Sequence, residues 1–366
     1  MCSDLVAEFN QVLSRVDAEA VAGYSRCSGM MVAGINEALG RHEGLSALLG
    51  PNDPDVMSGN HANHAAFMSF VLSAGSAKLL VDTVAWVYRS YLSRGFSPEY
   101  FIAELSAWID ALAQHIDRKQ AEPVIDVYRL MIHYHPRFVD LSRQPQSSYV
   151  PECDESGCFQ RFFEALLKPS LDDAIRVSRA CVSNTDQLHS WWLSVAKPAM
   201  YEVGRLWENG SITVGQEHIA TAIVQRVMAI HYQMIQDVPR NGQTLIVAAS
   251  PAELHELGAR MMADILELKG WNVVFTGADT PTDSVADLVT RHRAVALCVS
   301  TTMTFNLVNA KQMITALRSS LPIPTKVLVG GQAYRSDPEM FRWVGADCLA
   351  QTVDDVIARC VAIESG

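Results

Sequence analysis

The sequence predicts a multidomain protein of the α plus α/β class. Apolar residues recur three and four apart over residues 1–140, and short β-rich runs appear only after Asn241-Gly242. A chain of 366 residues is long enough for two or three domains with separate cores. We therefore expect an all-α domain over 1–140, a linker over 141–157, a four-helix bundle over 158–238 and a Rossmann-like, doubly wound parallel sheet over 239–366.

The first expected domain, 1–140, reads as helices almost throughout. The periodicity is clearest in AKLLVDTVAWVYRSYL, residues 77–92, and in PEYFIAELSAWIDAL, residues 98–112. Ser97-Pro98 is typical of a helix start, because proline is favoured in the first turn. The polar stretch LSRQPQSSYVPECDESG, residues 141–157, contains two prolines and little periodicity, which makes it the best linker candidate.

Two further patterns divide the rest of the chain. Helix breaks near Lys168-Pro169, Ser183-Asn184-Thr185 and Asn209-Gly210 predict four helices before residue 239. Beyond that residue, β-rich runs alternate with amphipathic segments of helix length, which predicts parallel strands covered by helices on both faces. The expected strands lie at 244–250, 271–277, 294–300, 326–331 and 347–350.

Composition excludes several classes of protein. The net charge of −11 and the absence of a Lys/Arg cluster disfavour direct nucleic-acid binding. Eight scattered cysteines without a C-x-x-C pair make structural zinc and a disulfide scaffold improbable. Neither a signal peptide nor an uninterrupted apolar span is apparent, so we expect a soluble cytoplasmic protein with no membrane contact.

A histidine follows the first expected strand. The loop reads Glu253-Leu254-His255-Glu256-Leu257-Gly258 and leads directly into a helical segment. This position is the carboxyl edge of the sheet, where open α/β sheets bind ligands. Taken alone, His255 is most simply a solvated loop residue.

Two further motifs accompany His255. Ser300-Thr301-Thr302 ends the third expected strand, and Gly330-Gly331 ends the fourth. The order and spacing of the three motifs resemble the cobalamin-binding fold of methionine synthase and the corrinoid mutases, whose pattern is D-x-H-x-x-G, S-x-L, then GG. Two positions differ from that pattern, because Glu253 replaces the usual Asp and Thr302 the usual Leu.

The resemblance implies that His255 is the lower axial ligand of cobalt. A carboxylate that bonds the other ring nitrogen would fix the tautomer and raise the basicity of the ligand, and Glu253 is the candidate. In this family the nucleotide tail of the cofactor is buried beside the sheet. The Ser300 hydroxyl and the side-chain-free Gly330-Gly331 suit such a pocket, although a glycine pair can equally form a simple strand-end turn.

The helical bundle carries a second pattern. Trp207 is followed, in the pattern W-x9-EH, by Glu217-His218, and the turn at Asn209-Gly210 should bring these residues together. On helices, such residues are more often core and surface. Directly before a cobalamin domain, however, W-x9-EH resembles the light-sensing cobalamin proteins that regulate bacterial carotenoid genes. That resemblance implies adenosylcobalamin, with the Trp covering the adenosyl group, the Glu bonding it, and light-driven loss of that group changing the oligomeric state.

The sequence departs from those photoreceptors in two places. A histidine directly after the Trp can take the vacated upper position in that family, whereas this chain has Glu208 there, so His218, water or a carboxylate would have to serve. Residues 1–140 contain no helix-turn-helix with a basic recognition helix. We therefore expect no direct operator binding, and an unknown downstream protein partner.

The N-terminal domain, 1–140, is characterised in the sequence by its length and its helical periodicity. Six or so helices in this length are compatible with a globin-like domain, among other bundles. The whole-chain layout resembles photocobilins, which pair the same cap and cobalamin domain with a bilin-binding domain, although no specific motif matches. Our hypothesis is that this domain holds biliverdin, with Arg89, Arg94 or Arg129 meeting its propionates and a His or Tyr near the pyrroles.

Two classes of function follow from these patterns. The first is a photosensor without catalytic turnover, whose self-association depends on light. The second is a corrinoid methyl carrier that serves a methyltransferase system, because the His255 motif and the helical cap are common to both classes. A pocket adapted to heme, or an empty one, is a third possibility.

Overall fold

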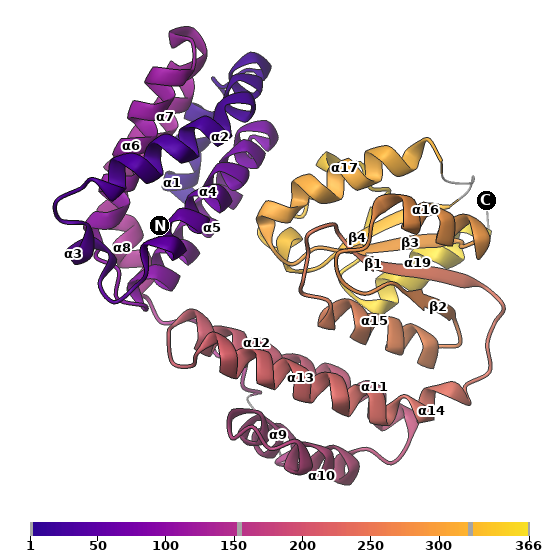
Figure 1. Ribbon diagram of the computed structural model, residues 1–366. Coiled ribbons are helices and arrows are strands. Elements are labelled where there is room, and N and C mark those ends of the chain that lie inside the picture. Colours follow the sequence, from indigo (N-terminus) through magenta and orange to yellow (C-terminus); the bar gives the residue numbers. More distant parts are fainter. Residues whose placement is uncertain (1–2, 152–155, 321–324, 365–366) are drawn as a thin grey trace. The chain divides into compact units, whose positions relative to one another are not determined.

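The computed structural model describes residues 3–151, 156–320 and 325–364, and the chain forms two compact units (Figure 1). The first unit comprises Met1–Pro145 together with the short segment Glu208–Gly210. The second comprises Gln146–Trp207 and Ser211–Gly366. We describe each unit by itself.

The first unit is all-α. Its core is rich in aromatic side chains, among which Tyr88 and Phe101 stack with ring centroids 3.7 Å apart. Asp17 and Asp53 cap two of the helices by accepting hydrogen bonds from backbone N–H groups. Residues 3–143 form α1 (Ser3–Leu13), α2 (Ala18–Gly40), α3 (Leu45–Leu49), α4 (Pro54–Ala74), α5 (Ala77–Leu92), α6 (Glu99–His115), α7 (Arg118–His133) and α8 (His135–Arg143).

These eight helices exceed the six or so that periodicity predicts. The excess comes from short elements. The helix α3 has only five residues and α8 nine, and such lengths contain too few turns to give an apolar repeat.

The helices before the sheet form a cap, which we define as residues 158–238; all of it belongs to the second unit except Glu208–Gly210. The segment from Thr185 to Glu208 is a single continuous helical arm, because the π-helical turn Trp192–Ala196 joins α11 to α12. The cap contains α9 (Cys158–Leu167), α10 (Leu171–Cys181), α11 (Thr185–Trp191), α12 (Lys197–Glu208), α13 (Val214–His231) and α14 (Gln233–Gln236). With α11 and α12 counted as one arm, four long helical arms result.

One feature of the cap corrects the sequence analysis. Cys158 and Cys181 form a disulfide, although the cysteine pattern indicated no such scaffold. The two residues open α9 and close α10. Because these helices pack on each other as a hairpin, residues 23 apart in sequence become neighbours, and cysteine spacing alone does not show this.

The rest of the second unit confirms the predicted parallel sheet. Its five strands, all parallel, are ordered β2-β1-β3-β4-β5. The helices α15 and α19 pack together on one face, and α16 and α17 on the other (Figure 1). The elements are β1 (Thr244–Ala249), α15 (Leu257–Leu268), β2 (Asn272–Phe275), α16 (Thr282–Arg291), β3 (Ala296–Ser300), α17 (Leu307–Arg318), β4 (Lys326–Gly330), α18 (Met340–Trp343), β5 (Cys348–Leu349) and α19 (Val353–Glu364).

The strand order locates the ligand-binding edge. The chain passes from β1 outward to β2 and then returns across β1 to β3, so the topology reverses between β1 and β3. Ligands of open α/β sheets bind beyond the carboxyl ends of the strands at such a switch point. The loops after β1 and β3 therefore bound the expected site.

Within the described residues, no helix has both the length and the apolarity needed to cross a membrane.

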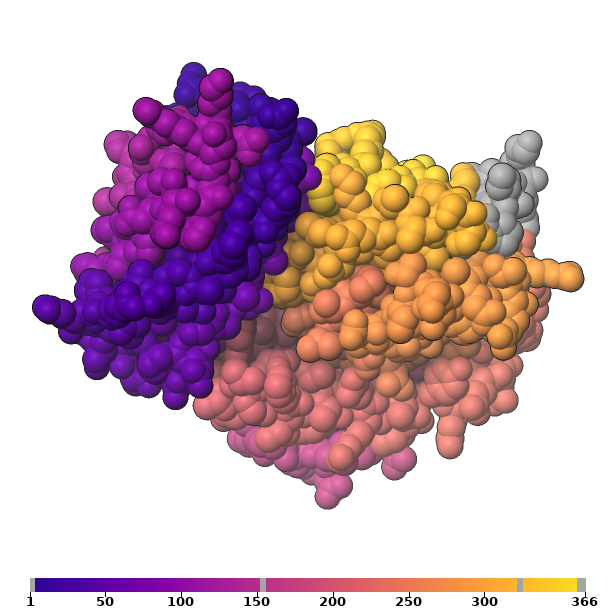
Figure 2. Space-filling model, turned by 45° about the horizontal axis from the view of Figure 1, so that its top comes forward, coloured from indigo at the N-terminus to yellow at the C-terminus, as the bar shows by residue number. Residues whose placement is uncertain are grey.

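Figure 2 shows the cap and the α/β segment of the second unit as adjoining surfaces. Side chains join them, and the Arg335 guanidinium donates to the Tyr201 hydroxyl at 3.1 Å.

Candidate functional site

Three loops meet at the carboxyl edge of the sheet. Ala249 at the end of β1 is paired with Ser300 of β3, and Ser300 is paired with Gly330 of β4. The loops that carry His255, Thr302 and Gly331 therefore start from neighbouring points, although the three strands lie far apart in the sequence.

A buried carboxylate organises the loop after β1. The Glu253 side chain is fully buried, and its Oε1 accepts a hydrogen bond from the His255 backbone N–H at 3.0 Å and lies 2.6 Å from His255 Nδ1. Its Oε2 accepts from the backbone N–H groups of Thr302 and Met303, at 3.0 and 2.9 Å, and from Asn306 Nδ2 at 3.1 Å. Glu253 thus fixes the His255 loop and joins it to the loop after β3.

These contacts set the protonation of the pair. Burial acts to raise the pKa of Glu253, but hydrogen bonds from His255, Met303 and Asn306 outweigh it and lower the pKa to about 2. The hydrogen bond to Glu253 raises the pKa of His255 against the opposing effect of burial, and the charge of Glu217 also raises it. Glu253 is therefore ionised at neutral pH and holds the Nδ1 proton of His255.

The remaining ring nitrogen suits a metal. The His255 side chain is 58% exposed, so its ring reaches solvent while Nδ1 is held from inside. A neutral imidazole held at Nδ1 by a carboxylate presents Nε2 as a ligand with raised basicity. The residues present therefore fit a corrinoid cobalt, to which His255 would supply one nitrogen ligand through Nε2.

The glycine pair lies against protein backbone. A Cβ at Gly330 would lie 2.3 Å from the Ala350 carbonyl oxygen, and one at Gly331 would lie 2.3 Å from that of Thr301. Gly331 also has a φ of +106°. The space that side chains would fill at these two positions is therefore occupied by backbone, on the side where a Cβ would point.

The other predicted residues of the α/β segment are more open. Ser300 and Thr302 are half-buried. Gly258 is exposed in the first turn of α15, and a Cβ there would meet no atom within 4 Å. The surroundings of Gly258 therefore leave space beside the His255 loop.

Sequence reasoning missed two residues that shape this loop. Asn306 donates to Glu253 and to the Ala252 carbonyl oxygen, the latter at 3.3 Å, and the Asp279 carboxylate accepts from the Ala252 N–H at 2.7 Å. Each lies just beyond the carboxyl end of a strand, and that position was the available signal. Their partners, however, are 54 and 27 residues away in sequence.

The cap contributes the three other predicted residues. Trp207 is half-buried in the last turn of α12, and Glu217 is in the first turn of α13. The Thr221 hydroxyl donates to Glu217 Oε1 at 2.8 Å. The His218 side chain is 72% exposed, with Nε2 3.5 Å from Glu217 Oε2. Because the charge of Glu217 raises the pKa of His255, Glu217 lies within electrostatic reach of the loop after β1.

Glu208, which stands where the photoreceptors have a histidine, forms an ion pair with Arg89. It belongs to the first unit, is buried, and its Oε1 accepts from Arg89 Nη1 at 2.7 Å. Ser93 Oγ donates to the Glu208 carbonyl oxygen at 2.9 Å. In this arrangement the Glu208 carboxylate is the partner of a guanidinium, which disfavours it as a metal ligand.

The first unit contains a buried network of tyrosines and histidines. The Tyr128 hydroxyl lies 3.0 Å from both the Tyr24 hydroxyl and His64 Nε2, and His61 Nε2 lies 3.0 Å from the Tyr100 hydroxyl. Glu104 is buried in the same core and accepts from Trp108 Nε1 at 3.4 Å. Polar groups in a core are usually kept for structure or for a ligand.

Burial also sets the charges in this network. It raises the pKa of Glu104 to about 7 and lowers the pKa of His61 and of His64 to about 4 and about 3. Both histidines are therefore neutral at neutral pH, and Glu104 keeps its proton to a higher pH than an exposed carboxyl does.

The three candidate arginines are all occupied. Arg89 binds Glu208, and the 54% exposed Arg129 binds Glu122 and Asp126. Arg94 Nη1 donates to the Ser90 carbonyl oxygen at 2.5 Å. A propionate that paired with one of them would have to displace or join these partners.

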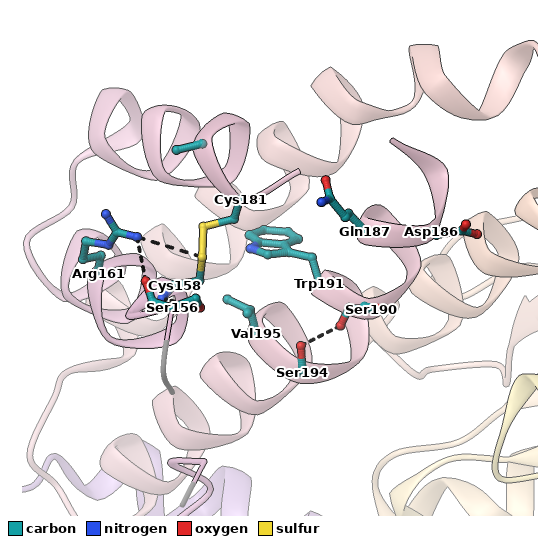
Figure 3. Close-up of a pocket in the computed structure, with 11 residues that line it drawn as sticks. Ser156, Cys158, Arg161, Cys181, Asp186, Gln187, Ser190, Trp191, Ser194 and Val195 are labelled. Carbon is teal, nitrogen blue, oxygen red and sulfur yellow. Dashed lines mark hydrogen bonds between the residues drawn. A yellow bond between two sulfur atoms is a disulfide. The ribbon is translucent and has the colours of Figure 1, made fainter. Parts of the chain in front are cut away.

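A hollow of about 520 Å³ lies elsewhere in the cap, beside the disulfide (Figure 3). Trp191 and the two bonded cysteines line it, along with polar side chains such as Gln187 and Asp186. None of the site residues predicted from the sequence lines this hollow.

Comparison with known proteins defines the class. Residues 243–360 match a family model described as a B12 binding domain, and residues 158–231 match a second model with the same description. The fold and the His255 site agree with these matches. The helical cap and the α/β domain of the second unit therefore each match a B12 binding domain, which supports cobalamin as the cofactor.

Individual proteins of known name are similar to parts of this chain. The chain is 31% identical, over 39% of its length, to the HTH-type transcriptional repressor CarH of Myxococcus xanthus, and the match spans 47% of the repressor. It is 23% identical, over 45% of its length, to trimethylamine corrinoid protein 1 of Methanosarcina acetivorans, of which 77% is covered. Among solved structures, the Methanosarcina barkeri monomethylamine corrinoid protein aligns with a TM-score of 0.49 and 19% identity, covering 58% of this chain and all of that one.

Proposed function

We propose that this chain is a cytoplasmic light sensor that uses adenosylcobalamin and has no catalytic turnover. When bound, adenosylcobalamin supplies a cobalt–carbon bond that visible light breaks. The observation that carries the proposal is the W-x9-EH pattern of the cap, which directly precedes the α/β domain that contains His255. The output is a light-dependent change in self-association or in contacts with a protein partner. The net charge of −11 argues against direct DNA binding in this role.

In this role each residue has a separate task. His255 would hold cobalt through Nε2, and Glu253 holds the opposite ring nitrogen so that the imidazole keeps its orientation. Trp207 would cover the adenosyl group and Glu217 would accept hydrogen bonds from it, while His218, exposed beside Glu217, would be the candidate to hold cobalt once that group is lost. Ser300, Thr302 and Gly258 would line the surface on which the cofactor rests, and the glycine pair would let that surface pack closely on the backbone of Thr301 and Ala350.

Green light applied to the adenosylcobalamin-loaded chain tests the proposal. We expect the visible spectrum and the gel-filtration volume to change on illumination.

Trp207→Ala should reduce the preference for adenosylcobalamin over methylcobalamin about tenfold, since an aromatic cover contributes roughly 1 to 2 kcal/mol. Trp343→Ala, far along the chain in α18, is the control and should keep the preference. Equal preference in wild type and Trp207→Ala would refute the role of the tryptophan.

The alternative is a corrinoid methyl carrier, and the relatives named as trimethylamine corrinoid proteins favour it. A carrier requires open access to the upper face and functions with methylcobalamin. The same illumination experiment separates the two, because a carrier would show no change in its association state under light.

We further propose that the first unit is a globin-like domain that binds biliverdin. The buried network around Tyr128 and His64 supports this, because it offers neutral hydrogen-bonding groups in an otherwise apolar core. Biliverdin added to the full chain should give a red-shifted, saturable absorption band. His64→Leu should weaken that binding about tenfold. A bilin spectrum identical with that of free biliverdin would refute this second chromophore.

A further inference from the structure

The His255 loop carries a second carboxylate, which faces the cap. Glu256 follows His255 directly and is the N-cap residue of α15. Its Oε1 accepts a hydrogen bond of 3.1 Å from the Gln225 side-chain amide in α13. Its Oε2 accepts one of 2.9 Å from the backbone N–H of Ala278, in the loop after β2. One half-buried side chain therefore joins three segments at the residue next to His255.

The Glu256 side chain packs closely against the loop after β2. Gly277 has a φ of +82°, and a Cβ at this position would lie 3.2 Å from Glu256 Oε2. The same loop is held a second time, because Asp279 accepts from the Ala252 N–H at 2.7 Å. The Glu256 carboxylate is thus seated against backbone on one side, which orients its other oxygen toward Gln225.

Gln225 belongs to a polar row on α13. Glu217, Thr221 and Gln225 are spaced four residues apart, so they follow one face of the helix. Thr221 donates to Glu217, and Gln225 donates to Glu256. One face of α13 therefore carries both Glu217 and the residue that donates to Glu256.

We propose that Glu256 is a positioning residue that fixes the cap helix α13, and with it Glu217, relative to the His255 loop. It acts through Gln225 and Ala278. Because its acceptor is charged, the bond to Gln225 is stronger than one between neutral groups. The functional meaning of the inference rests on the proposed cobalamin sensor, since this bond would set where the cap lies beside the lower ligand.

A reciprocal pair of substitutions tests the bond. Gln225→Glu places a second carboxylate opposite Glu256, so we expect amide hydrogen exchange in α13 around position 225 and at Ala278 to become about tenfold faster. Adding Glu256→Gln should return both rates to within about twofold of wild type, because in that double variant the amide nitrogen donates to the introduced carboxylate while its oxygen accepts from Ala278. The exchange is measured by mass spectrometry on the full, cobalamin-free chain.

Ile219→Glu is the matched control, because it adds the same charge at an exposed position of the same helix that lies off the row from Glu217 to Gln225, and it should leave the rates unchanged. If Gln225→Glu does not fold by circular dichroism, Gln225→Ala takes its place and should speed exchange about fivefold. Unchanged exchange in the Gln225 variant, or no rescue by Glu256→Gln, overturns the proposal. A wild-type chain that fails to bind adenosylcobalamin would overturn the sensor but not this result, since the exchange experiment contains no cofactor.

Discussion

His255→Ala should lower the affinity of the chain for adenosylcobalamin about 100-fold or more. The reason is geometric, because the His255 ring is exposed at the switch point of the sheet while its Nδ1 is held by an ionised carboxylate. Loss of partners that orient a metal ligand typically costs roughly 10- to 100-fold, and loss of the ligand itself should cost no less. Equilibrium dialysis gives the affinity, and the visible spectrum of any bound cofactor shows whether a protein nitrogen remains on cobalt.

Two further variants serve as a comparison and as a control for His255→Ala. Glu253→Gln should give an intermediate loss, roughly 10- to 100-fold, because an amide oxygen cannot serve all the donors that the two carboxylate oxygens now accept. His292→Ala removes an exposed histidine after α16 and should leave binding intact. Unchanged affinity and spectrum in His255→Ala would exclude His255 from the cobalt site.

Gly331→Ala should destabilise the α/β domain by about 4 kcal/mol. Its φ of +106° is unfavourable for a residue with a Cβ, and that Cβ would lie 2.3 Å from a backbone oxygen of Thr301. The Thr301 backbone cannot yield easily, because its N–H is bonded to the Gly330 carbonyl oxygen and its own oxygen accepts from Ala333. Any shift would also displace Thr302 and Met303, which donate to Glu253. Urea denaturation followed by circular dichroism gives the stability.

Gly242→Ala separates the energetic cost of a positive φ from the cost of a steric clash with neighbouring backbone. Gly242 has a φ of +87°, but a Cβ there would meet no atom within 4 Å. It should therefore cost only the backbone term, about 1 to 2 kcal/mol. If the two alanine variants were equally stable, the close approach at Thr301 would have no energetic weight.

The α/β domain was the part of the fold best predicted from the sequence. Buried parallel strands are short apolar runs, and each of the five expected runs contains a strand. The short helices α3 and α8 were not predicted, since helices of their lengths show too little periodicity. The disulfide was not predicted because Cys158 and Cys181 approach each other only when α9 and α10 pack.

The candidate site, like the fold, was predicted from the sequence only in part. Spacing placed His255, Ser300 and Gly330 at one edge, because parallel strands have fixed register once their order is known. Spacing could not show that Glu253 is buried or that it collects donors from the distant loop after β3. Nor could it show that Glu208 is paired with Arg89, or that the glycine pair makes room for backbone. Such facts depend on tertiary contacts, which a one-dimensional pattern does not contain.

The hydrogen bonds that Glu253 accepts have a thermodynamic consequence. They are made entirely by atoms of the chain, so the conformational entropy of the His255 loop is lost when the protein folds. A cofactor that arrives at a loop already ordered gives up less of its binding free energy to arranging it. Binding should therefore show a small entropic penalty on the protein side. The lower half of the pocket would behave as a rigid socket, and adaptation to the ligand would fall to the cap.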